Sequence, residues 1–197
     1  MKKAATRTTI IIVLLVLAAV GYYAYLSGRS RESKAETSMT YIETTLSRDL
    51  SKDYPPTPKE VVKYYNEILR CLYNEDATDE EIEALGLKAR ELYDDDLLAI
   101  NELGTYHMRL YADVQMWREN ERRYVGFNLA SSTNVEIYEV DGYTFAKIQC
   151  GYNVMQKGQN YPSNLMYLLR KDVNKRWKIY GWKDVSELES PAAALTE

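Results

Sequence analysis

The chain begins with one long apolar segment. It starts at Ile10, ends at Leu26 (IIIVLLVLAAVGYYAYL), contains no charged residue and follows a short basic N-terminus. Extended by the two threonines before it, the segment would span roughly 28 Å as a helix, close to the hydrocarbon thickness of a bilayer. The pattern predicts that residues 10–26 form a single-pass transmembrane anchor. The lipid bilayer is therefore an expected partner of this protein.

A cleaved signal peptide is the competing interpretation of this segment. Its best cleavage site follows Ala19-Val20-Gly21, but Tyr22 and Tyr23 come directly afterwards. Tyrosines at the end of an apolar run are typical of the aromatic belt of a membrane-spanning helix, whereas a signal peptide needs a shorter core and small residues at its end. The retained anchor is therefore favoured over cleavage.

The orientation of the anchor depends on the basic residues that flank it. Three basic residues precede the segment and three follow it, at Arg29, Arg31 and Lys34, so the positive-inside comparison is nearly balanced. A short basic N-terminus usually stays in the cytoplasm. We therefore expect localisation in the cell membrane, with the C-terminal domain extracytoplasmic.

Capping signals and helical periodicity dominate residues 57–117. TPKE (57–60) places a capping Thr57 before Pro58 at the first helical position, and Glu60 can bond back to the cap. Apolar residues at helical spacing then follow up to Leu72. A second capping box at 78–81 opens another helix. We expect both segments to be helices packed on a core.

Two further helices are predicted before the pattern changes. Asp94-Asp95-Asp96 would cap a short helix that contains Leu97, Leu98 and Ile100, because acidic residues favour a helix start. Apolar residues between Leu103 and Trp117 indicate a longer helix, which we expect to end in the arginine-rich residues 118–123.

The C-terminal third alternates with a period of two. We expect strands at 135–138, 143–156, 165–169 and 177–182, with turns at Asp141-Gly142, 157–162 and 172–175. Short connections make neighbouring strands antiparallel. Helices followed by a four-stranded meander predict an α+β domain whose helices cover one face of the sheet.

Composition excludes some functions and leaves others open. The net charge of −4 and pI near 5.3 argue against a nucleic-acid partner. Residues 75–102 hold eleven acidic side chains, which are explained by a solvated helix surface or by a face for a basic partner or a cation. Cys71 and Cys150 lack the spacing of a zinc or dithiol site, so free buried cysteines are favoured over a disulfide.

No catalytic motif is evident. His107 is the single histidine, and Asp113, six residues later, would not share its helix face. No phosphate-binding glycine loop, nucleophile elbow or zinc-protease motif is present. We expect no catalytic residue, no metal and no cofactor.

The order of elements resembles the nuclear-transport-factor-2-like (NTF2-like) superfamily. The resemblance rests on TPKEVVKYYNEILRCLYN (57–74), ARELYDDDLLAIN (89–101) and RWKIYGWKDV (176–185). It implies a curved sheet wrapped on helices, a conical pocket and dimerisation through the sheet face. The chain also resembles membrane-anchored families of unknown function from Gram-positive anaerobes, which share the anchor and a YPPTP-type helix start.

A conical pocket suggests candidate lining residues, because tyrosine and tryptophan combine an apolar ring with a polar tip. These candidates are Tyr65, Tyr111, Trp117, Tyr152, Tyr167, Tyr180 and Trp182. The expected organisation is a cytoplasmic N-terminus and anchor (1–28), a linker with a possible short helix (29–56), the cone-shaped domain (57–185) and a flexible tail (186–197).

Three function classes fit these expectations. The favoured one is a non-catalytic extracytoplasmic module that binds a small ligand or a protein partner, or forms a homodimer through its sheet face. The alternatives are a cyclase- or isomerase-like enzyme that uses the pocket, and a structural subunit of an envelope complex. Fold alone does not decide between them.

Overall fold

The computed structural model describes residues 39–188, and the expected anchor at residues 10–26 lies outside them. One compact unit begins at Tyr41. Its helices are α2 (Tyr41–Leu46), α3 (Pro58–Asn74), α4 (Asp79–Arg90), α5 (Asp95–Ile100), α6 (Leu103–Glu119), the 3-10 helix η1 (Ser132–Asn134) and α7 (Val185–Leu188). Its strands are β1 (Arg122–Leu129), β2 (Glu136–Val140), β3 (Tyr143–Gln156), β4 (Gln159–Lys171) and β5 (Trp177–Asp184). No helix within residues 39–188 is long and apolar enough to cross a membrane.

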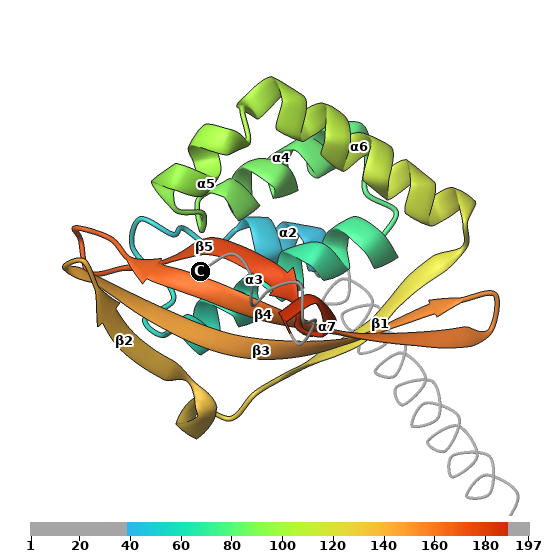
Figure 1. Cartoon of the computed structure of the whole chain (residues 1–197). Coiled ribbons are helices and arrows are strands. Elements are labelled where there is room, and N and C mark those ends of the chain that lie inside the picture. The colour runs from blue at the N-terminus through green and yellow to red at the C-terminus, as the bar shows by residue number, and fades with distance from the viewer. Residues whose placement is uncertain (1–38, 189–197) are drawn as a thin grey trace, which may run out of the picture. The chain divides into compact units, whose positions relative to one another are not determined.

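The architecture is α+β, as the sequence predicts. The antiparallel strands run in the order β1-β3-β4-β5, and β2 pairs with the other half of β3. Helices α2 to α6 lie on one side of the curved sheet, and α3 packs directly on it (Figure 1). One face of the sheet is therefore buried by helices.

The capping signals act where the sequence places them. The Thr57 side chain accepts the backbone N–H of Glu60, although no return bond from Glu60 is made among the described residues. Thr78 and Glu81 form both bonds of a capping box, and Asp94 caps α5 by accepting the N–H of Asp96. These caps fix where α3, α4 and α5 begin. Together these helices carry much of the core.

Removal of the α3 cap should weaken the domain measurably. Thr57→Ala leaves the N–H of Glu60 without its acceptor, so we expect a loss of about 0.5–2 kcal/mol in the free energy of unfolding. Urea denaturation followed by circular dichroism measures it, with the exposed Thr44→Ala as the control. Equal stability of the two variants would show that the Thr57 cap does not stabilise α3.

The long central strand has the predicted alternation. Ala146, Ile148 and Cys150 are fully buried beneath the helices, and Tyr152 is nearly so. Lys147 and Gln149, between them, are exposed on the other face. The register assigned from period two is therefore confirmed. Both cysteines are buried and free, as predicted.

Two expectations about the sheet are wrong. The sheet has five strands rather than four, because α6 ends at Glu119 and the arginine-rich residues lead into β1. The turn expected at 157–162 is also too long. Only Lys157 and Gly158, both with positive φ, form it, and β4 already begins at Gln159.

The segment before residue 57 contributes to the core. α2 packs against α3, and both Ile42 and Leu50 are buried in the same cluster as the sheet residues. The Tyr64 hydroxyl donates to the Thr45 carbonyl at 2.6 Å. Residues 41–56, expected within the linker, are thus packed on the domain.

Candidate functional site

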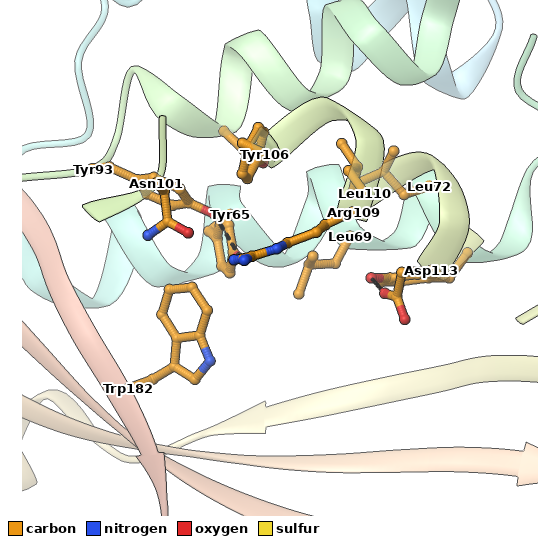
Figure 2. Close-up of a pocket in the computed structure, with 12 residues that line it drawn as sticks. Tyr65, Leu69, Leu72, Tyr93, Asn101, Tyr106, Arg109, Leu110, Asp113 and Trp182 are labelled. Atoms are coloured by element: carbon orange, nitrogen blue, oxygen red, sulfur yellow. Dashed lines mark hydrogen bonds between the residues drawn. The ribbon is translucent and has the colours of Figure 1, made fainter. Parts of the chain in front are cut away.

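A cavity of about 410 Å³ lies between α3, α6 and the end of β5 (Figure 2). Tyrosines dominate its wall, together with one arginine and one aspartate. Its lining residues are Tyr65, Leu69, Leu72, Tyr73, Ala89, Tyr93, Asn101, Tyr106, Arg109, Leu110, Asp113 and Trp182. Small-molecule sites in proteins are typically concave, of this size and mostly apolar, with a few polar groups.

A second cavity of about 250 Å³ adjoins the first. The two share Tyr65, Leu69, Tyr73 and Trp182. The rest of its wall comes from α6 and the concave face of the sheet: Trp117, Tyr124, Tyr152, Val154, Ser163, Leu165 and Tyr167. Together they make an aromatic hollow that extends from the helices onto the sheet.

Helical spacing explains how α3 and α6 supply this wall. Tyr65, Leu69 and Tyr73 follow one another at four-residue intervals, so they lie on one face of α3. On α6, Arg109 and Asp113 have the same spacing. The face of α3 that covers the sheet thus also lines both cavities.

Trp182 reaches the cavities because of a β-bulge. Strict alternation along β5 would place Trp182 on the same face as Tyr180, away from the helices. The β4–β5 register shifts between Leu168 and Leu169, where Tyr180 has no partner in the ladder. Beyond this bulge Trp182 turns inward, and its ring centroid lies 5.9 Å from that of Tyr65.

The buried tyrosine hydroxyls form two pairs. The hydroxyls of Tyr65 and Tyr93 lie 3.1 Å apart, and those of Tyr152 and Tyr167 lie 2.6 Å apart. Burial raises the pKa of all four, so they remain neutral at physiological pH. The walls therefore offer uncharged hydrogen-bonding groups within an apolar surface.

One carboxylate faces the first cavity. The Tyr73 hydroxyl donates to Asp113 Oδ2, and the Tyr73 ring stacks on Trp117 with centroids 4.3 Å apart. Burial, followed by the nearby Asp113 charge, raises the pKa of Tyr73. Asp113 lines the first cavity, and no acidic side chain is among the residues that line the second.

Of the seven residues that the sequence nominates for a pocket, five line these cavities. These are Tyr65, Trp117, Tyr152, Tyr167 and Trp182. Tyr111 lies instead beside a surface depression of α4 and α6, and Tyr180 lies on the outer face of the sheet against Phe145 and Arg170. Their part in binding stays a prediction.

Sequence reasoning missed several lining residues. Tyr73 and Tyr106 were not nominated, nor were Tyr93, Tyr124, Arg109 and Asp113. A signal existed for Tyr73, because it lies eight residues after Tyr65 and therefore on the same helix face. No local pattern points to Tyr93, which enters through a bridge between its backbone and Ile179 of β5.

His107 lies away from the aromatic hollow. Its Nδ1 is 3.9 Å from a carboxylate oxygen of Glu83, and its buried Nε2 has no hydrogen-bond partner among the described residues. As their spacing predicts, His107 and Asp113 make no pair. Across residues 39–188, no cluster of three or more His, Cys, Asp or Glu side chains could hold a metal.

Comparison with known proteins gives a family and no activity. The family described as "Domain of unknown function (DUF6715)" matches residues 1–182. A search of curated proteins found no match.

Proposed function

The chain belongs to the DUF6715 family, and we propose that it is a membrane-anchored extracytoplasmic module that binds a small ligand without transforming it. The observation that carries the proposal is the pair of adjoining cavities with a shared aromatic wall. Core tyrosines usually pack against neighbours on all sides, whereas these line about 410 and 250 Å³ of space. A ligand with an aromatic or apolar body fits such walls.

Adjacent residues of β4 allow a controlled test. Ser163 lines the second cavity, and Asn164, next along the strand, is exposed on the opposite face. Ser163→Trp should fill the cavity with an indole ring, whereas Asn164→Trp adds the same ring outside it. The probe is 1-naphthaleneacetamide, a neutral bicyclic aromatic molecule, titrated by calorimetry into the full chain in lipid nanodiscs.

We expect Ser163→Trp to weaken probe binding at least about tenfold, which corresponds to roughly 1.4 kcal/mol, and Asn164→Trp to leave it unchanged. Empty nanodiscs correct for partition of the probe into lipid. Equal affinity of both variants would place the probe elsewhere. Absence of binding to the unaltered chain would contradict the proposal.

The membrane part of the proposal rests on the apolar run of residues 10–26 and the tyrosines that follow it. A retained anchor predicts that the full-mass protein stays in the membrane fraction after extraction with alkaline carbonate. A soluble secreted form that begins near Tyr22 would contradict it.

We also propose that residues 57–185 have the cone-shaped NTF2-like fold. Support comes from the long helix α3 across a curved antiparallel sheet and from cavities between helices and sheet. Superposition of an experimental structure on members of that superfamily tests it. A different strand order in the best-matching folds would contradict the assignment.

A cyclase- or isomerase-like enzyme is the second candidate function, and Asp113 favours it. A carboxylate on the wall of an aromatic cavity could accept a proton from a carbon next to a carbonyl. This predicts that the chain speeds deuterium exchange at the methylene of naphthylacetone in D₂O, and that Asp113→Asn abolishes the gain. No gain over buffer would leave the non-catalytic module as the better account.

A further inference from the structure

Arg109 is an exposed cation among the residues that line the first cavity, and it has no partner within residues 39–188. From it we propose that the ligand carries a carboxylate, which binds the Arg109 guanidinium while the apolar body of the ligand lies on the aromatic walls. The proposal rests on the proposed function, because it names the class of ligand for the same cavities.

The position of Arg109 differs from that of its basic neighbours. Arg90 donates to the Asn101 carbonyl at 2.5 Å and lies over the Tyr106 ring, and Arg118 donates to the Ala77 carbonyl at 2.8 Å. Within residues 39–188 the Arg109 guanidinium makes no hydrogen bond, ion pair or ring contact. Its side chain extends from α6 into the cavity, toward Tyr65 and Trp182 (Figure 2).

The groups around Arg109 suit an anion. The paired hydroxyls of Tyr65 and Tyr93 keep their protons, because burial raises the pKa of both, so neither carries negative charge and one of the two protons is used in the bond between them. The Asn101 side chain uses one amide proton on the Leu97 carbonyl, which leaves the other free. Arg90, whose guanidinium donates to the Asn101 carbonyl, adds a second positive charge on the Asn101 side of the cavity.

Asp113 makes one side of the cavity unfavourable for a ligand carboxylate. Figure 2 shows Asn101 and Asp113 on opposite sides of the Arg109 side chain. Like charges repel, so a ligand carboxylate is disfavoured beside Asp113 and favoured on the Asn101 side. A guanidinium can bind both oxygens of a carboxylate in one plane, which is why the inference names a carboxylate. The ligand body then extends past Leu69 and Trp182 toward the second cavity.

The test compares two probes of the same size and shape that differ at one group, a charged carboxylate or its neutral amide. These are 1-naphthaleneacetate and its amide, 1-naphthaleneacetamide, titrated into the full chain in nanodiscs of uncharged lipid. We expect the acetate to bind about tenfold tighter than the amide, since the carboxylate adds a charge–charge attraction and a second accepting oxygen for the guanidinium. Arg109→Gln should remove this preference, because it should weaken binding of the acetate much more than binding of the amide.

Two further variants separate the local effect from net charge. Arg123→Gln, on β1 and outside both cavities, makes the same change of charge and should keep the preference. Asp113→Asn removes the opposing charge and should tighten binding of the acetate several-fold more than binding of the amide. Raising the salt concentration should reduce the preference for the acetate in the unaltered chain.

The outcomes distinguish the two proposals. Equal affinity of acetate and amide, or a preference that survives Arg109→Gln, overturns the carboxylate inference while the cavity still binds ligands. If neither probe binds, the proposed function fails and the inference falls with it. Loss of preference in Arg109→Gln together with its retention in Arg123→Gln supports the inference.

Discussion

Ile148→Asp is expected to unfold the domain, whereas Gln149→Asp, one residue later, should be mild. Ile148 is fully buried in β3 and is paired with the buried Tyr167 of β4. An unpaired carboxylate there loses its hydration and gains no partner, at a cost of several kcal/mol. Because native domains are stable by only about 5–15 kcal/mol, a loss of this size removes most or all of the folded population.

Gln149 is the matched control because it follows Ile148 directly on the same strand and lies on the opposite face of the sheet. It is exposed on the outer side of the sheet, so its carboxylate stays hydrated, and β-propensity cannot explain a difference between adjacent sites. Circular dichroism and urea unfolding measure both variants. If both remained folded with unchanged stability, β3 would not pack beneath the helices.

Gln149→Asp also tests the homodimer through the sheet face that is expected from the sequence. Gln149→Asp places a charge on the outer face in each of two facing copies. If that face joins two copies, the variant should stay folded but show a lower mass by light scattering than the unaltered chain. An unchanged mass would contradict a dimer through this surface.

Much of the fold could be predicted because helix caps and strand alternation depend on residues that are close together in the sequence. Thr57, Thr78 and Asp94 each accept the N–H groups at the start of a helix, and this chemistry requires no tertiary contact. The register of β3 could be predicted because a strand with one buried face must alternate over its whole length. A long and strictly alternating segment identifies both the element and its inner face.

β1 was missed because its pattern is irregular. The strand begins with Arg122 and Arg123, which resemble the polar end of a helix in the sequence, and only Tyr124 is buried along it. Its pairing with β3 also shifts between Tyr124 and Gly126, which breaks the period of two. The pairing that holds β1 is with residues 150–156, far along the chain, and no local signal encodes that contact.

The overlong turn has a different cause. Pro162 and its polar neighbours are typical of a loop, yet they lie in β4 opposite Asn153. β5 pairs with β4 only from Leu165 onward, so β4 is an edge strand at Pro162. The missing N–H of proline is tolerated at an edge.

The site was only partly predictable because it combines helix faces with a bulge. The aromatic residues of α3 share a face by spacing alone, but Trp182 enters through a shift in register that depends on how β4 and β5 pair. Arg109 and Asp113 resemble an ordinary charged helix surface in the sequence. Their significance comes from the aromatic walls of α3 and the sheet that they face.

An ion pair joins the start of α5 to the sheet. Asp94 is 4% exposed, and its Oδ2 accepts from Arg170 Nε at 2.9 Å while Oδ1 accepts from Nη2 of the same guanidinium. Asp94 also caps α5, and its backbone N–H donates to the Ile179 carbonyl of β5. One residue thus connects a helix start, an edge strand and a guanidinium.

Asp94→Ala should cost about 4 kcal/mol in the free energy of unfolding. The loss of one partner of a buried pair leaves the other charge uncompensated, which typically costs 3–5 kcal/mol, and loss of the cap adds roughly 1 kcal/mol. The low end applies because Arg170 keeps a second partner, with its Nη1 at 2.9 Å from a carboxylate oxygen of Asp96. Arg170 also lies over the rings of Tyr143 and Tyr180.

Two variants divide this cost between the charge and the cap. Asp94→Asn can still cap α5 but lacks the charge, so it should be about 1 kcal/mol more stable than Asp94→Ala and keep the rest of the loss. Asp96→Ala removes the exposed partner, which is 60% exposed, and should cost under about 1 kcal/mol because solvent screens such pairs. Urea unfolding of the three variants measures these differences. An Asp96→Ala loss as large as that of Asp94→Ala would show that burial does not set the strength of this pair.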